Sequence, residues 1–159
     1  MSNMANDVRA QYQRAFTTIA NIANAFPQES WLKAHGDEYY IPSRIAYHLA
    51  VFTDGMVAGG SQDPDFRAKL PFGAWMEGTA ETLPTKEAFI AYFNAVVERA
   101  NKALEGINDE GLCGPIDPAR ARMGTTQIAF HLYSMRELSA HTGELNKMLI
   151  ENGIDDIWS

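Results

Sequence analysis

Two side chains that can hold a metal ion, Glu137 and His141, lie four residues apart in the C-terminal part of the sequence. In an α-helix such residues share one face, with Cβ atoms about 5–6 Å apart. A carboxylate and an imidazole at that separation can bind one ion together if a third ligand comes from elsewhere in the fold. His48 is the candidate third ligand, because it lies on the apolar face of an expected helix. The sequence therefore predicts a metal site made of His48, Glu137 and His141, provided that the two helices meet.

The same residues have simpler explanations. A glutamate and a histidine at this spacing can form a surface hydrogen bond, and an inward-facing histidine is often structural. His131 precedes His141 by ten residues, which is about 15 Å along a helix axis, so these two cannot share an ion. We expect His131 to be a core histidine with a hydrogen-bond partner, and His35 to be a solvated loop residue.

Apolar residues recur at helical spacing in four segments, with no strand-length alternation between them. The expected helices cover approximately residues 6–26, 42–58, 85–107 and 125–152. Pro42 suits a first helical turn, Thr85 an N-cap, and Gly153 a left-handed C-cap. These features predict an all-α protein, and four amphipathic helices of this length are typical of a four-helix bundle.

The orientation of the candidate ligands can be read from helical wheels at 100° per residue. Glu137 and His141 fall at the edge of the apolar stripe of their helix, where a site can be both organised and reachable. His48 is flanked on its wheel by Ile45 and Phe52, so we expect it to face the interior.

The connection formed by residues 59–84 is too long for a simple helix hairpin. An extended chain covers about 3.3 Å per residue, so this segment could travel the length of the bundle and let the second and third helices run parallel. It contains Phe72, Trp75 and Met76. We expect these apolar residues to pack over one end of the bundle, as the wall of a pocket.

Size and composition limit the classes of function. A chain of 159 residues predicts one domain, residues 1–159, with its own core. The net charge of −7 and the lack of a basic run argue against a nucleic-acid partner. No stretch approaches the ~20 apolar residues of a membrane span, and the N-terminus lacks the apolar core of a signal peptide. With Cys113 as the single cysteine, in an expected loop, we predict a cytoplasmic protein with no membrane partner. Its aromatic content leaves a homodimer as an option.

Two stretches of the sequence resemble the DinB-like (damage-inducible) metalloenzyme superfamily. One is Pro-Ser-x-Ile-Ala-x-His-Leu at residues 42–49, and the other is His-x-Gly-Glu-Leu-Asn at residues 141–146, followed by Leu149, Gly153, Ile154 and Trp158. The likeness extends from about residue 8 to residue 158. It implies a four-helix bundle of up-down-down-up topology with a long crossover between the second and third helices.

The resemblance also implies one divalent transition metal (zinc, nickel or iron) held by three histidines. His48 and His141 match the first and last ligands, whereas Glu137 occupies the position of the middle histidine. A set of two histidines and one carboxylate still binds such metals. The alternative is a site that has decayed and binds none.

Relatives in this superfamily imply a function in which the metal activates a low-molecular-weight thiol or a water, as in a thiol S-transferase or a small hydrolase. Arg44 would then hold an anionic group of a small-molecule substrate, or else be a solvated arginine with a packed stem. Trp75 and Tyr47 would line the pocket. The competing hypothesis is a metal-free, non-catalytic bundle that acts as a small-molecule-binding or dimeric stress protein.

Overall fold

The protein is mostly helical over residues 3–157, the part of the chain that this computed structural model describes. Its long helices are α1 (Met4–Ala25), α2 (Pro42–Phe52), α3 (Lys86–Glu105) and α5 (Gln127–Glu151). No strand occurs among the described residues, so the all-α prediction is confirmed. Trp158, which contributes to the family resemblance, lies outside the described residues.

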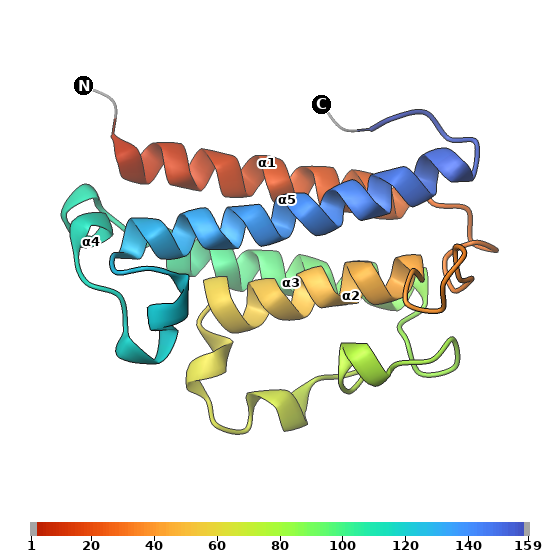
Figure 1. Cartoon of the computed structure of the whole chain (residues 1–159), viewed down its shortest axis with the longest axis horizontal. Coiled ribbons are helices and arrows are strands. Elements are labelled where there is room, and N and C mark those ends of the chain that lie inside the picture. The colour runs from red at the N-terminus through yellow and green to blue at the C-terminus, as the bar shows by residue number, and fades with distance from the viewer. Residues whose placement is uncertain (1–2, 158–159) are drawn as a thin grey trace.

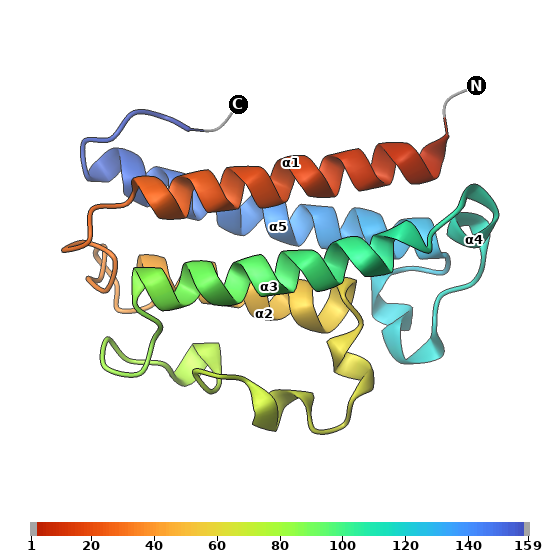
Figure 2. The same cartoon turned by 180° about the vertical axis from the view of Figure 1, so that it is seen from behind.

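The long helices lie side by side around one apolar core (Figure 1). Helix α1 contacts α3 and α5, and α2 contacts the same two helices. Following the chain in Figure 1 and Figure 2, α1 and α5 run in one direction while α2 and α3 run in the other. The crossover of residues 59–84 thus connects two parallel helices, an arrangement that its length permits. This arrangement brings α2, which carries His48, against α5, which carries Glu137 and His141.

Capping residues define the helix ends. The side chains of Asn3, Thr85 and Thr126 accept hydrogen bonds from backbone N–H groups three residues later, at 3.1, 3.2 and 3.4 Å. These bonds satisfy donors that would otherwise have no partner within the helix. Gly153 follows α5 with a φ of 79°, so the predicted left-handed cap is confirmed.

The helical segment that begins at Pro42 changes character before it ends. α2 continues into a π-helical turn, η1 (Thr53–Val57), which is capped by Ala58 and followed by Gly59 with a φ of 83°. The Thr53 hydroxyl donates to the Leu49 carbonyl at 2.8 Å within this segment. In the π turn Asp54 is buried and accepts from Arg99 of α3, so the turn joins α2 to α3. The expected helix of residues 42–58 is present, but its π turn was not predicted.

The crossover does not pack over one end of the molecule. Figure 1 and Figure 2 both show it running alongside α2 and α3, through the short turns η2 (Gly60–Gln62), η3 (Phe66–Lys69) and η4 (Trp75–Glu77). Phe72 packs against Tyr47, with ring centroids 5.4 Å apart, and the Tyr47 hydroxyl donates a hydrogen bond to the Gly73 carbonyl. Met76 is 68% exposed, contrary to its expected packing. The prediction that this segment packs over one end of the bundle is therefore wrong. It packs along the side of α2 instead, because Tyr47 of α2 binds it there.

The connection between α3 and α5 includes two short helical elements. It contains α4 (Asp109–Cys113) and the turn η5 (Pro118–Met123). The Asn108 side chain caps α4 by accepting from the Gly111 N–H at 2.8 Å. Cys113 is exposed at the end of α4, rather than in a loop.

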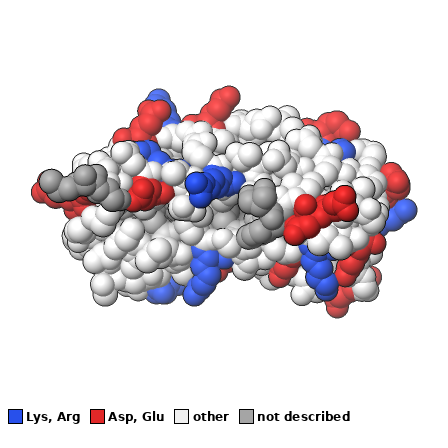
Figure 3. Space-filling view, turned by 90° about the horizontal axis from the view of Figure 1, so that it is seen from above, with Lys and Arg blue, Asp and Glu red and all other residues white. Residues whose placement is uncertain are grey.

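Within residues 3–157, none of the helices has both the length and the apolar character needed to cross a bilayer. Figure 3 looks onto α1 and α5, where acidic and basic groups are interspersed among uncharged residues. The described part of this face carries no continuous basic patch.

Candidate metal centre

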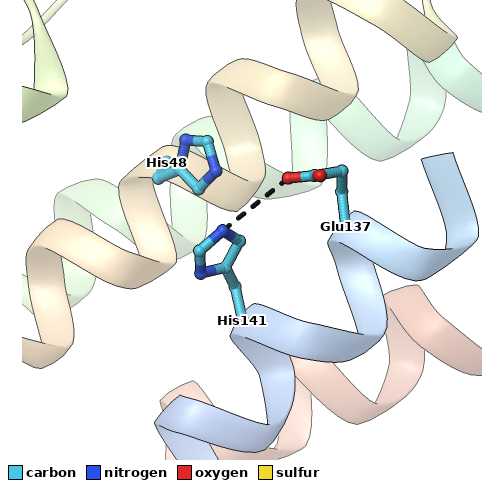
Figure 4. A group of neighbouring side chains, drawn as sticks. All are labelled: His48, Glu137 and His141. Atoms are coloured by element: carbon cyan, nitrogen blue, oxygen red, sulfur yellow. Dashed lines mark ion pairs between the residues drawn. The ribbon is translucent and has the colours of Figure 1, made fainter. Parts of the chain in front are cut away.

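His48, Glu137 and His141 converge between α2 and α5. One ligand atom of each lies within 4.8 Å of the others, and Figure 4 shows the three side chains turned toward a common point. The Nε2 of His141 is 3.8 Å from the Oε2 of Glu137. The rings of His48 and His141 meet edge to face, with centroids 4.5 Å apart. The helix contact on which the sequence prediction depended is therefore present.

The packing of apolar neighbours fixes the two helix faces that carry the site. On α2, Ile45 and Leu49 are fully buried on either side of the turn that presents His48. On α5, Leu138 and Leu145 are fully buried next to the Glu137/His141 face. Because these residues belong to one core cluster, the helices cannot slide past each other without breaking it.

His48 sits in an aromatic environment. Its ring lies 4.1 Å from that of Trp75 and 6.3 Å from that of Phe52, between centroids. The Nδ1 atom is buried and has no hydrogen-bond partner among the described protein atoms. Burial, and then the nearby His141, lower the pKa of His48 to about 4. The imidazole is therefore neutral at neutral pH, and a neutral imidazole is the form that binds metals.

Glu137 is turned toward the site and toward solvent at once. Its side chain is 24% exposed, and its Oε1 lies 3.6 Å from the Nη2 of Arg136. Arg136 is itself 70% exposed, so this ion pair is weak. The other carboxylate oxygen faces His141 (Figure 4), which is the orientation that a metal ligand needs.

Glu144 is a site residue that the sequence analysis missed. Its Oε2 lies 2.7 Å from the Nδ1 of His141, one turn along α5. At 100° per residue Glu144 falls on the polar side of its helix, which does not mark it as a site residue. The i,i+3 spacing from His141 is the signal that could have identified the contact.

Arg44 connects two loops beside the site. Its Nη1 donates to the Glu38 carbonyl at 3.1 Å, and its Nη2 donates to the Gly78 carbonyl. Both terminal nitrogens thus already bind backbone oxygens, while Nε is buried with no hydrogen-bond partner among residues 3–157. The geometry gives Arg44 a structural role, and the predicted binding of substrate by Arg44 stays a prediction.

Aromatic side chains border the site on the crossover side. Besides His48, Trp75 contacts Tyr39, and the centroids of the Trp75 and Tyr39 rings are 6.3 Å apart. Burial raises the pKa of Tyr39, and the charge of Glu144 adds to this effect. Tyr47, by contrast, is fully buried and anchors the crossover. Trp75 therefore lies next to His48, as expected for a residue that lines the site. The Tyr47 side chain instead contacts Phe72 and Gly73 of the crossover.

The other two histidines lie outside the cluster. His131 is buried, and its Nδ1 is 3.1 Å from the Tyr12 hydroxyl, so the prediction of a hydrogen-bonded core histidine is confirmed. Burial lowers its pKa to about 4. His35 is half-buried, with Nε2 3.2 Å from Asn152 and Nδ1 3.4 Å from Glu151. The prediction of a solvated His35 is wrong, because its loop packs onto the end of α5.

The three donors fit a divalent transition metal. Metal bonds of about 2.0–2.2 Å place neighbouring ligand atoms roughly 3–3.5 Å apart. The observed separations, up to 4.8 Å, are somewhat larger, so small side-chain rotations would close the set around one ion. Comparisons with protein families, curated proteins and solved structures give no match to this chain.

Proposed function

We propose that this protein is a metal-dependent enzyme of the DinB-like superfamily, with one divalent metal held by His48, Glu137 and His141. The observation that carries the proposal is the convergence of these ligand atoms, from two helices distant in sequence, within 4.8 Å. We assign α1, α2, α3 and α5 to the up-down-down-up four-helix bundle of that superfamily. Their directions (Figure 1) and the long crossover support this assignment.

In this proposal the bound metal would supply the chemistry, and the residues around it would leave room for a substrate and exclude water. A divalent cation in such a site lowers the pKa of a bound thiol or water and supplies a nucleophile at neutral pH. Three protein ligands leave positions free for that group. Trp75 and Phe52 keep water from one side of His48. The activity that follows is thiol S-transfer, or hydrolysis of a small substrate, and the exposed single Cys113 fits a reducing, cytoplasmic setting.

Elemental analysis of the untagged protein tests the metal directly. We expect about one equivalent of zinc, nickel or iron per chain, and its loss in the His48→Ala and Glu137→Ala variants. His35→Ala is the matched control, since His35 contacts the end of α5 instead of the cluster. Wild-type protein that holds no metal after incubation with each of the three salts would contradict the proposal.

The contacts of Glu137 favour a second candidate function. Arg136 and His141 both pair with Glu137, and Glu144 pairs with His141, so protein groups can satisfy this cluster without a metal. The alternative is a non-catalytic, metal-free protein that binds small molecules or acts as a dimeric stress protein. A thermal-shift screen of common cellular thiols separates the two. Stabilisation that requires added metal supports the enzyme, and stabilisation without metal supports the alternative.

A further inference from the structure

We propose that Glu144 is a positioning residue of this centre, whose carboxylate holds His141 in the tautomer that directs Nε2 toward Glu137 and His48. The role of the tautomer in metal binding rests on the function proposed above. The tautomer itself is a property of the metal-free protein, and it can be tested separately.

The hydrogen bond determines where the ring proton lies. The Oε2 of Glu144 is 2.7 Å from the Nδ1 of His141. An ionised carboxylate only accepts hydrogen bonds, so in a neutral ring Nδ1 must carry the proton. Nε2 then has the free lone pair, and this is the atom that lies 3.8 Å from the Oε2 of Glu137.

The same bond fixes the orientation of the ring. Glu144 and His141 are one helical turn apart on α5, and their side chains are 34% and 18% exposed. A short, partly shielded bond to a charged acceptor is stronger than a neutral one. It holds the His141 ring nearly perpendicular to that of His48, at an interplanar angle of 87°. In metal sites, a carboxylate that accepts from the second nitrogen of a ligating histidine raises the basicity of the ligand and fixes its direction.

His48 and His141 differ in the hydrogen bonding of their Nδ1 atoms. His48 Nδ1 is buried and has no hydrogen-bond partner among the described protein atoms, whereas His141 Nδ1 has Glu144. Packing against Trp75 holds the His48 ring in place. The orientation of the His141 ring thus depends on one side-chain hydrogen bond, and Glu144 provides that bond.

Nitrogen NMR of the metal-free protein tests the tautomer. In the wild type, the His141 ring should show a protonated Nδ1 and an unprotonated Nε2. In Glu144→Ala, the Nε2–H form should become substantial, whereas Glu144→Gln should retain the wild-type form because its amide oxygen still accepts. Glu144 lines a cavity of about 150 Å³, so its truncation opens onto existing space and leaves the fold intact. Helical circular dichroism of each variant checks this.

Competition with a chromophoric chelator, using zinc and cobalt(II), tests the consequence. Glu144→Ala should bind each metal about 10–100-fold more weakly than the wild type, with Glu144→Gln between them. The matched control is Glu151→Ala, which alters the same cavity without touching His141. Its affinity should stay within about twofold of the wild type, a change well below the range for lost outer-shell partners.

The outcomes separate this proposal from the previous one. A protonated Nε2 in the wild type, or a Glu144→Ala affinity equal to that of the Glu151→Ala control, would overturn the role of Glu144. If the wild type shows the expected tautomer and Glu144→Ala loses it, but neither binds metal, the positioning role stands and the metal function fails.

Discussion

The imidazole rings of His48 and His141 meet at an angle of 87°, with centroids 4.5 Å apart, although they belong to different helices. Two protonated rings at this distance would repel each other. The neighbouring His141 accordingly contributes to the lowered pKa of His48, after the larger effect of burial. The contact therefore favours the neutral form of the His48 imidazole.

Metal binding should stabilise the fold, because the ligands come together only in the native state. At a free metal concentration about 100 times Kd, the gain is about 2.7 kcal/mol, which corresponds to a rise in Tm of roughly 5–10 °C for a domain of this size. Glu137→Gln should lose most of that rise. The exposed Glu105→Gln is the control, and differential scanning calorimetry is the measurement. Equal shifts in both variants would place the metal elsewhere.

Trp75 should report metal binding through its fluorescence. Its ring centroid lies 4.1 Å from that of His48, so a paramagnetic ion such as nickel(II) or copper(II) at the site would quench its emission. Quenching should saturate at about one equivalent of metal. Trp31 is fully buried and donates to the Pro84 carbonyl instead. Trp75→Phe should abolish most of the quenching, and a response that survives this substitution would contradict the assigned position of the metal.

Local sequence features were enough to predict the four long helices. Thr85 and Gly153 mark helix ends through bonds and backbone angles that involve only their neighbours in sequence. The wheel also placed Glu137 and His141 correctly at the edge of the buried face. The π turn at Asp54 escaped prediction because it depends on a partner from another helix, Arg99.

The site itself was only partly readable from the sequence. Residue types and spacing selected the three candidate ligands, but whether α2 and α5 meet at that level depends on how all the core side chains pack. The contact between His141 and Glu144 was missed, because the residue types and spacing that select candidate ligands do not select the groups that orient them. Arg44 was interpreted through its charge, whereas its bonds go to the backbone of Glu38 and Gly78.

The ion pair between the π turn and α3 should be important for stability. Asp54 is buried and accepts two hydrogen bonds from Arg99, at 3.0 and 2.9 Å, and one from the Tyr92 hydroxyl at 2.9 Å. Asp54→Ala leaves the Tyr92 hydroxyl and the Arg99 guanidinium without this acceptor, and we expect it to cost about 3 kcal/mol in the free energy of unfolding.

Urea denaturation provides the measurement, and a surface ion pair provides the comparison. Asp63 bonds Lys69 at 2.6 Å, but both side chains are largely open to solvent. Asp63→Ala should therefore change the stability little. Similar losses in the Asp54 and Asp63 variants would mean that the buried network adds nothing beyond an exposed pair.

His131 should make the protein less stable in acid. In the native state its pKa is lowered from 6.5 to about 4, because the ring is buried. As the pH falls below 6.5, the unfolded chain takes up a proton that the native His131 does not accept, so the free energy of unfolding decreases until the native pKa is reached. Above 6.5 both states are neutral at this residue, and no pH dependence arises from it. Integrated down to the native pKa, the loss is about 3 kcal/mol.

The variant His131→Phe isolates this contribution. It removes the bond to the Tyr12 hydroxyl, so we expect it to be less stable than the wild type at neutral pH. Its free energy of unfolding should nevertheless fall less steeply between the two pKa values, since carboxylates and His48 titrate in both proteins and cancel in the difference. Urea denaturation at a series of pH values measures that difference. Parallel pH profiles for the wild type and the variant would show that the buried His131 is protonated without cost to the fold.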